Sequence, residues 1–283
     1  MPVFQKTISK EGEISGIGLH TGKSTSVILK PSAEDSGVRF FQDGHLIKPL
    51  LIEMDKSSSG ESPRCSIVTD GKRSILTVEH LLAAIYGLGI TNIDMDVQGP
   101  EIPALDGSAL GFVKLFRKLK VRRQKKPAFI YEIREPIFLG EPSKSIAIYP
   151  SFGAQKLSVS YVMDYSHPYL SKQKVDFEVS PEVFEKEIAP ARTFITEEEE
   201  AGIRERRLGL GGSAENTLII RRDGAHKKKL RFRDECARHK VLDVIGDLAA
   251  LGSPVSGHVV GLRSGHLLNR KLVLEIKKQR GEL

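Results

Sequence analysis

Two periodicities of hydrophobic residues divide the first half of the chain into strands and helices. Residues 3–10, 24–30 and 93–97 alternate between apolar and polar positions, which predicts half-buried strands. Residues 77–86 and 108–119 instead carry apolar residues at helical spacing, and glycines follow the first of these segments where a helix would end. We therefore expect strands followed by two helices in this half.

The second half repeats this theme more loosely. The same patterns predict strands at 129–139, 145–149, 157–163 and 257–263, and helices at 181–186, 234–250 and 267–279. Residues 197–212 interrupt the pattern with four consecutive acids, an arginine-rich patch and a glycine-rich end. We expect this segment to be a mobile insert rather than part of a core.

A basic segment closed by a proline, residues 120–127, separates the two halves and is the expected domain boundary. We place an N-terminal α+β domain at residues 1–122 and a C-terminal α+β domain at residues 127–283. No repeat is visible in the literal residues, but each half has strands followed by two helices, so we expect two domains of similar architecture. A chain of 283 residues is long enough for two such domains.

Composition excludes several classes of protein. No apolar run approaches the roughly 18–20 residues that a membrane-spanning helix needs. The polar start lacks the hydrophobic segment of a secretory signal, and two cysteines do not make a disulfide framework. We therefore expect a cytoplasmic protein in a reducing environment, without a transmembrane segment.

The net charge of +7 suggests an anionic partner, which could be nucleic acid, lipid headgroups or a phosphorylated small molecule. The charge is concentrated at residues 118–126 and 227–233, and such runs most often form solvated surface. Aromatic residues make up only 6% of the chain and tryptophan is absent. The chain therefore has few aromatic side chains on which the bases of a single-stranded nucleic acid could stack. A basic RNA-binding module stays open as an alternative; it predicts salt-dependent RNA affinity and no bound metal.

One predicted helix of the second half carries three polar side chains on a single stripe. His239, Asp243 and Asp247 are four residues apart and therefore lie one above another. The apolar residues among them indicate that the helix packs closely, so the stripe must face something specific. Far upstream, the adjacent Glu79 and His80 point about 100° apart on another predicted helix. This spacing alone is weak evidence for a metal site. The imidazoles of His80 and His239 and the carboxylate of Asp243 would nevertheless fill three positions of an open zinc site.

The ligand set favours one kind of metal and one kind of chemistry. Two imidazoles suit zinc better than magnesium or calcium, whereas iron(II) would accept the same ligands and stays an alternative. Glu79, beside a ligand, could take the proton of a metal-activated water, which is the chemistry of metal-assisted hydrolysis.

Three further side chains could take part in such a reaction. His266 follows a Ser-Gly pair after a predicted strand; beside Asp247 it would be held protonated and could donate to a leaving amine, although a lone loop histidine is more often solvated. Lys240 directly follows a ligand and would bring positive charge, unless it is an ordinary exposed lysine. Thr193 offers a hydroxyl, which alone is weak support.

Other candidates have plainer interpretations. His20, within the glycine-rich residues 16–22, could be a fourth ligand, but we favour a structural or pocket-lining role because the open site is already complete. That glycine segment also lacks the following helix that phosphate binding requires. Tyr165 could stack on a base or be a half-buried packing residue. Cys65 and Cys236 have no paired metal spacing and are expected to be buried small hydrophobes.

Six segments together make the chain similar to a known family. They are SGIGLHTGK at 15–23, TVEHL at 77–81, PEIPALDGSA at 100–109, ARTF at 191–194, RHKVLDVIGD at 238–247 and SGHLLN at 264–269. In this order they resemble the UDP-3-O-acyl-N-acetylglucosamine deacetylase family, zinc amidases of lipid A synthesis. The resemblance spans nearly the whole chain, and several such motifs together are highly specific.

The resemblance implies an activity and an architecture. The activity is hydrolysis of the N-acetyl amide of UDP-3-O-(3-hydroxyacyl)-N-acetylglucosamine to acetate and the free-amine UDP-3-O-acyl-glucosamine, the committed step of lipid A biosynthesis. The architecture is two α+β domains, each a β-sheet layer with two helices, whose helices pack between two outer sheets. The resemblance implies zinc bound by His80, His239 and Asp243. It implies catalytic roles for Glu79, Thr193, Lys240, Asp247 and His266.

The resemblance also implies how the substrate is held. An insert near residues 195–213 would form an apolar passage for the fatty acyl chain, with Leu19, Phe194 and Gly212 among the substrate-binding residues. Tyr165 occupies a usually aromatic position where the uracil stacks. Arg263 stands where the family often has a lysine near the nucleotide, and the charge is kept.

The expected partner is therefore an acylated UDP sugar and not nucleic acid, and a peripheral position near the inner membrane is left open. Another zinc amidohydrolase, acting on a peptide or a simple sugar, is the nearer alternative. Removal of the fatty chain from the substrate would separate the two, because only the acyl-chain enzyme should lose turnover.

Overall fold

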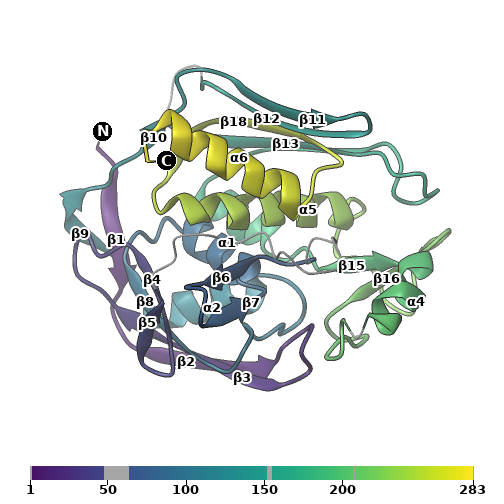
Figure 1. Ribbon diagram of the computed structural model, residues 1–283, viewed down its shortest axis with the longest axis horizontal. Helices are drawn as coiled ribbons and strands as arrows, with labels where there is room; N and C mark the ends of the chain where they lie inside the picture. The colour runs from purple at the N-terminus through teal and green to yellow at the C-terminus, as the bar shows by residue number, and fades with distance from the viewer. Residues whose placement is uncertain (1, 48–63, 152–154, 207, 283) are drawn as a thin grey trace.

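Two β-sheets form the outer layers of the molecule, and the helices α1, α2, α5 and α6 lie between them (Figure 1). The computed structural model describes residues 2–47, 64–151, 155–206 and 208–282. This arrangement confirms the expected α+β class, with helices between two outer sheets. The domain limits at 1–122 and 127–283 stay predictions, and residues 48–63 of the first lie outside the described part of the chain.

The N-terminal half supplies one outer sheet and two of the inner helices. The sheet has the order β2-β3-β8-β4-β5, in which β4 runs parallel to β8 and the other pairs are antiparallel. Alternation along β3 buries Val27 and Leu29 against the helices, as its sequence predicts. The elements are β2 (Gly12–Ile17), β3 (Ser24–Pro31), β4 (Val38–Gln42), β5 (His45–Ile47), β8 (Ile93–Gln98), α1 (Glu79–Gly87) and α2 (Leu110–Leu119).

The C-terminal half supplies the other outer sheet and the other two inner helices. Its order is β11-β12-β18-β13-β14, with β13 parallel to β18 and β10 added beside β18. Val159, Tyr161 and Met163 of β13 are fully buried on the face toward the helices. The elements are β10 (Tyr131–Glu132), β11 (Ile137–Glu141), β12 (Lys144–Tyr149), β13 (Leu157–Met163), β14 (Gln173–Glu178), β18 (Val255–Leu262), α5 (Glu235–Leu248) and α6 (His266–Gln279).

Smaller elements complete the fold. A small sheet and α4 project from one side of the layers (Figure 1). They are β15 (Phe194–Thr196), β16 (Leu218–Arg221), β17 (Gly224–Ala225) and α4 (Glu197–Glu205). The others are β1 (Phe4–Ile8) paired with β9 (Val121–Pro127), β6 (Ile67–Thr69) paired with β7 (Ser74–Leu76), α3 (Pro181–Val183) continued by a π-helical turn at Phe184–Ile188, and a 3₁₀ turn at Ala249–Leu251 after α5.

Three of the predicted segments take a different form in the structure. The segment expected as a linker at 120–127 contains strand β9, whose basic side chains stay exposed while its backbone pairs with β1. The single strand expected at 129–139 is two strands, β10 and β11, in different pairings. The segment expected as a mobile insert contains helix α4, which its row of glutamates suits because acids favour the first turn of a helix.

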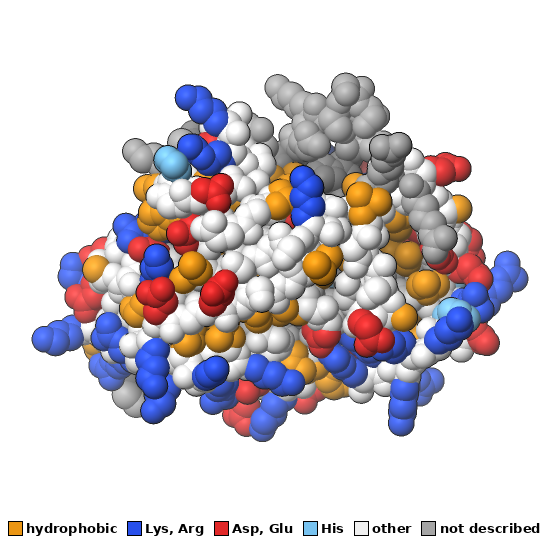
Figure 2. Space-filling model, turned by 90° about the horizontal axis from the view of Figure 1, so that it is seen from below, with side chains coloured by type: hydrophobic (Ala, Val, Ile, Leu, Met, Phe, Trp, Pro, Cys, Tyr) orange, Lys and Arg blue, Asp and Glu red, His pale blue; other side chains and the backbone are white. Residues whose placement is uncertain are grey.

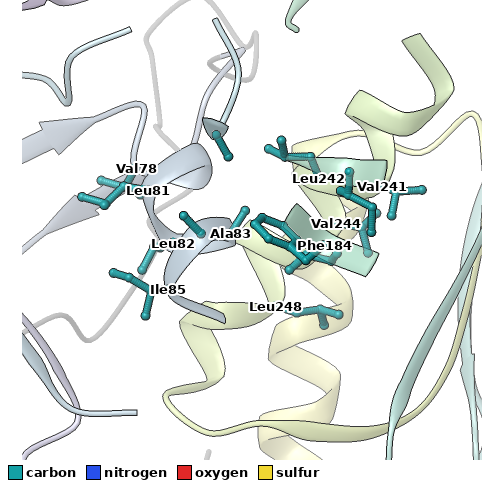
Figure 3. Packing of buried hydrophobic residues seen from close by; sticks show 14 of the residues in the cluster. Val78, Leu81, Leu82, Ala83, Ile85, Phe184, Val241, Leu242, Val244 and Leu248 are labelled. Carbon is teal, nitrogen blue, oxygen red and sulfur yellow. The ribbon is translucent and has the colours of Figure 1, made fainter. Parts of the chain in front are cut away.

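The centre of the molecule is the crossing of α1 and α5. Both helices are buried on nearly all sides, because each is covered by a sheet, by its partner and by further helices. Figure 3 shows Ala83 of α1 next to Phe184 of the π-helical turn, with Val244 and Leu248 of α5 beside them. Gly246 lets the backbones meet, since a Cβ there would lie 2.2 Å from the carbonyl oxygen of Glu79. The crossing thus brings the start of α1 against the polar stripe of α5.

The basic surface is mixed with acidic groups. On the face shown in Figure 2, lysine and arginine side chains stand along the rim and alternate with acidic ones. In the described part of the chain, several basic side chains form ion pairs with acidic ones, among them Lys126 with Asp35. None of the helices in the described part of the chain is long and apolar enough to cross a bilayer.

We predict that Gly246→Ala destabilises the protein by roughly 1–3 kcal/mol, although alanine is the better helix former, because the added methyl must push the α1 backbone away. Chemical denaturation would measure the free energy of unfolding. Gly202→Ala in α4 is the matched control: a Cβ there meets nothing within 4 Å, so a gain of about 0.5–1 kcal/mol is expected. Equal effects of the two variants would contradict the role given to the crossing.

Candidate active site

A cavity of about 550 Å³ opens where the two halves meet. Its walls come from the glycine-rich loop after β2, the start of α1, the stripe of α5, the start of α6 and the segment around β15 and α4. All of the site residues expected from the sequence line this cavity except Asp247, which lies behind His266. Residues far apart in the sequence therefore meet as predicted.

Three side chains in this cavity form a buried group that could hold a metal ion. One possible ligand atom from each of His80, His239 and Asp243 lies within 4.8 Å of the others. The Nε2 atoms of His239 and His80 are 3.4 and 3.9 Å from Asp243 Oδ1. The two rings meet edge to face, with their centroids 5.0 Å apart. The ring nitrogens thus converge on one side of a single carboxylate oxygen.

The state of these groups fits a metal cation. Asp243 Oδ1 is buried without a hydrogen-bond partner among the described residues, and such an oxygen needs a partner. His239 Nδ1 lies 3.1 Å from the carbonyl of Ala191; because a carbonyl only accepts, Nδ1 carries the proton and Nε2 offers its lone pair. Burial lowers the pKa of His80 to about 3 and also lowers the pKa of His239, so both imidazoles are neutral, as ligands must be.

Lys240 supplies the positive charge beside this group. Its Nζ donates to Asp243 Oδ2 at 2.8 Å and lies 5.7 Å from the centre of the Phe194 ring. Burial opposes the ionisation of Asp243, but the neighbouring cationic groups, of which Lys240 contributes most, together outweigh burial and keep the pKa of the carboxyl well below its usual range. Lys240 is therefore part of the cavity rather than an exposed helix lysine.

Glu79 faces the same space from the start of α1. Its Oε2 accepts a hydrogen bond from the backbone N–H of Ser66 at 2.9 Å, while Oε1 faces His266 Nε2 at 3.8 Å. Burial raises the pKa of Glu79 to about 7. A carboxyl group with such a pKa can accept or release a proton near neutrality.

His266 stands opposite Glu79 and is held by a buried carboxylate. Its Nδ1 lies 2.9 Å from Asp247 Oδ2, so Nε2 points into the cavity. Burial alone would lower the pKa of His266, but the carboxylates of Asp247 and Asp243 outweigh it and raise the pKa to about 9. His266 is therefore a protonated donor at neutral pH, and it is not solvated as a lone loop histidine would be.

Two residues that hold Asp247 were missed from the sequence. Ser66 donates its hydroxyl to Asp247 Oδ1, and Asn269 donates its amide to Oδ2 at 2.8 Å. Asn269 lies in the segment SGHLLN and could have been found one turn after His266 on α6. Ser66 gives no such signal, because it lies in a loop before a three-residue strand and reaches α5 only through the fold.

A buried ion pair fixes the segment that carries Ala191 and Thr193. Arg192 Nε donates to Glu235 Oε1 at 2.7 Å, and both side chains are almost wholly buried. Glu235 begins the helix that carries His239 one turn later, so this pair joins the Ala191 carbonyl to the ligand that it orients. The backbone N–H of Thr193 donates to the carbonyl of Gly107 at 2.8 Å, which keeps Thr193 at the cavity wall.

The cavity has an apolar arm. Its lining includes Ile195, Ile203, Leu208 and Ile219, which come from the small sheet, α4 and the loop that follows α4. Leu19 joins this wall through its carbonyl, which accepts from the backbone N–H of Gly211 at 3.0 Å. Gly212 lines the cavity beside this contact. The segment expected to form an acyl passage thus contributes apolar side chains to the cavity.

Another part of the cavity lining is basic and aromatic. The guanidinium carbon of Arg263 lies 5.5 Å from the centre of the Tyr165 ring, and Lys144 lines the wall near them. Such a pair can stack on a planar base and attract an anionic group. Tyr165 is half-buried and packs against the core as well, which confirms the packing interpretation. Its stacking on a base stays a prediction.

The remaining candidates take the plainer roles expected of them. His20 lines the cavity but is not in the metal-binding group, and burial lowers its pKa. Cys65 and Cys236 are buried and free. The basic run at 227–233 is partly fixed in position, because Arg231 forms an ion pair with Asp106 at 2.8 Å.

These groups together fit a metal-dependent hydrolase centre: three side chains that could bind a metal, a carboxyl group of raised pKa and a protonated imidazole around one space. Comparison with known proteins agrees with this class. The family model described as UDP-3-O-acyl N-acetylglycosamine deacetylase matches residues 5–278. The chain therefore belongs to this family.

Curated relatives named as deacetylases of this kind match the chain along nearly their full length. A protein of Oleidesulfovibrio alaskensis named UDP-3-O-acyl-N-acetylglucosamine deacetylase is 39% identical over 97% of this chain and 89% of its own. Proteins of the same name from Syntrophotalea carbinolica and Methylococcus capsulatus are each 37% identical, over 97% and 98% of this chain and 88% and 91% of their own.

Proposed function

We propose that this protein hydrolyses the N-acetyl amide of UDP-3-O-(3-hydroxyacyl)-N-acetylglucosamine with the help of a zinc ion, in the committed step of lipid A biosynthesis. The products are acetate and the free-amine UDP sugar, which keeps its acyl chain. The observation that carries the proposal is the convergence of His80, His239 and Asp243, with Glu79 and His266 facing each other 3.8 Å apart beside them.

His80, His239 and Asp243 would hold the metal. Two imidazoles and a carboxylate favour zinc over magnesium or calcium, and iron(II) is the alternative that the donor set also accepts. When bound, the metal supplies a Lewis acid that polarises the amide carbonyl and makes a water molecule more acidic. The remaining chemistry belongs to side chains of the chain.

Glu79 and His266 divide the two proton transfers. Glu79 Oε1 takes a proton from the attacking water, whose oxygen forms the new bond to the carbonyl carbon of the acetyl group. Thr193 and Lys240 stabilise the negative charge that develops on the carbonyl oxygen. His266 Nε2 then gives its proton to the nitrogen as the C–N bond breaks, and Asp247 keeps the imidazole oriented and protonated.

The rest of the cavity would select the substrate. The apolar arm from the segment at 195–213, with Leu19, Phe194 and Gly212, suits a fatty acyl chain. Tyr165 and Arg263 suit the uracil and the charge of the nucleotide. Another amidohydrolase acting on a peptide or simple sugar is the alternative, and it would have no use for the apolar arm.

A cytoplasmic location and a small-molecule partner complete the proposal. Both cysteines are buried and unpaired, which is typical of a reducing compartment. Deacetylation should be assayed on the acylated UDP sugar and on the same sugar without its acyl chain. Rapid turnover of the first and poor turnover of the second supports the proposal; equal turnover supports the alternative amidohydrolase.

His239→Ala should abolish zinc binding, because only two ligands remain and the orienting Ala191 carbonyl loses its donor. If the three ligands are correct, we expect elemental analysis of the purified wild-type protein to find about one zinc ion per chain. His258→Ala, which removes an imidazole from the outer face of β18, is the control that keeps the metal. Full zinc content in His239→Ala would overturn the ligand assignment.

Glu79→Gln should keep zinc and lose roughly two to four orders of magnitude in kcat. The amide oxygen can still accept from the N–H of Ser66, but the amide nitrogen cannot take a proton from water. Single-turnover kinetics and metal analysis on the same sample separate the two effects. Near-normal turnover with bound zinc would reject Glu79 as the base.

Asp247→Asn should move the alkaline limb of the pH–rate profile to lower pH. The active form of His266 is protonated, so the rate falls as the pH rises through the pKa of His266, and the carboxylate of Asp247 is what raises that pKa to about 9. Profiles of kcat against pH would measure the shift. His266→Ala should lose this limb altogether; a limb unchanged in both variants would assign the acid role, too, to Glu79.

A further inference from the structure

One buried carboxylate lies between two walls of the active site and accepts its hydrogen bonds from residues other than the three proposed metal ligands. Glu101 has no exposed surface and follows β8 in a short extended segment. Its two oxygens accept hydrogen bonds from the backbone N–H groups of His20 and Thr21, and from the hydroxyls of Thr21 and Thr77. These donors belong to two segments that are more than fifty positions apart in the chain.

The first wall is the glycine-rich loop that carries Leu19 and His20 into the cavity. Thr21 donates to Glu101 Oε2 twice, from its N–H and its hydroxyl, both at 2.8 Å. The carboxylate fits under the loop only because Gly18 has no side chain: a Cβ there would lie 2.4 Å from Oε2. A backbone bridge between Gly18 and Pro103 runs beside these bonds. The loop therefore closes around the carboxylate.

The second wall is the start of α1. The hydroxyl of Thr77 donates to Glu101 Oε1 at 2.7 Å, and Thr77 has a φ of +58°. A left-handed conformation is rare for a β-branched residue and persists only where its surroundings enforce it. Glu79 and His80 follow two and three residues after Thr77, at the start of α1. Among the described residues, no side chain caps the N-terminus of this helix. The direction of its first turn is therefore set by how Thr77 is held.

We propose that Glu101 is a positioning residue that aligns these two walls, placing Glu79 and His80 through Thr77 and placing Leu19 and His20 through Thr21. The two arms act on different parts of the site. The Thr77 arm governs the metal ligand and the base, whereas the Thr21 arm governs the wall that the substrate contacts. The kinetic part of this assignment rests on the proposed function; the metal-binding part does not.

Thr77→Val tests the first arm, because it keeps the size and branching of the side chain and removes only the hydroxyl. Loss of a residue that orients a ligand weakens metal binding by about 10–100-fold, so we expect at least a tenfold loss of zinc affinity in competition with a chelator. kcat should fall together with it, while KM stays within about twofold. Thr77→Ser restores the hydroxyl and should restore both zinc affinity and kcat.

Thr21→Val tests the second arm. It loosens the loop without touching the start of α1, so we expect KM for the acylated UDP sugar to rise about five- to tenfold, with zinc affinity and kcat nearly unchanged. Glu101→Gln places an amide nitrogen among hydrogen-bond donors and should produce both losses in one variant. Thr21→Val and Glu101→Gln keep the test decisive if Thr77→Val does not fold.

Thr7→Val is the matched control for a buried threonine hydroxyl. Thr7 is equally buried and accepts from the N–H of Ser32, far from the cavity, so its loss should lower the melting temperature and leave zinc affinity, kcat and KM as in wild type. Loss of stability alone in the Thr77, Thr21 and Glu101 variants, as in this control, would overturn the proposal. A wild-type protein that binds zinc but leaves the acylated sugar intact would refute the proposed function, and zinc affinity would still decide the Thr77 arm.

Discussion

The active site depends on the close crossing of two buried helices. At Gly246 the backbone of α5 meets the carbonyl of Glu79 with no room for a methyl group, and His239, Asp243 and Asp247 lie within two turns of this contact on the same helix. His80 can reach His239 and Asp243 only at this separation, because imidazole and carboxylate side chains are short. The packing of Ala83 against Phe184 and its neighbours holds the same contact from the apolar side (Figure 3). Core packing and ligand geometry are therefore one constraint.

The same burial that brings the ligands together makes every charge there costly, and the structure offsets this cost with hydrogen bonds. Asp247 is surrounded by three donors and Glu101 by four, and Glu235 pairs with Arg192. Among the buried carboxylate oxygens of the described residues, Asp243 Oδ1 is the one without a donor, and it faces Nε2 of His80 and of His239. A carboxylate oxygen left unpaired beside two neutral imidazoles suits a cation.

The sequence predicted the parts of this site that depend on local spacing. The stripe of His239, Asp243 and Asp247 follows from helical periodicity, and the adjacent Glu79 and His80 follow from a second predicted helix. The partnership of Ser66 with Asp247, and of Glu101 with Thr77, spans long stretches of chain and is created by tertiary pairing that no local pattern encodes. Strand β9 was missed for the same reason: its side chains are exposed and basic, and only its backbone pairing with β1 makes it a strand.

The seam between the glycine-rich loop and the segment after α4 is made of main-chain atoms. Gly211 donates to the carbonyl of Leu19, and a Cβ on Gly211 would lie 2.1 Å from the carbonyl oxygen of Gly18. Any side chain at position 211 would therefore push the two segments apart. The size of the molecule that the cavity admits can be altered with less disturbance at Ile203 and Leu208, whose side chains line it.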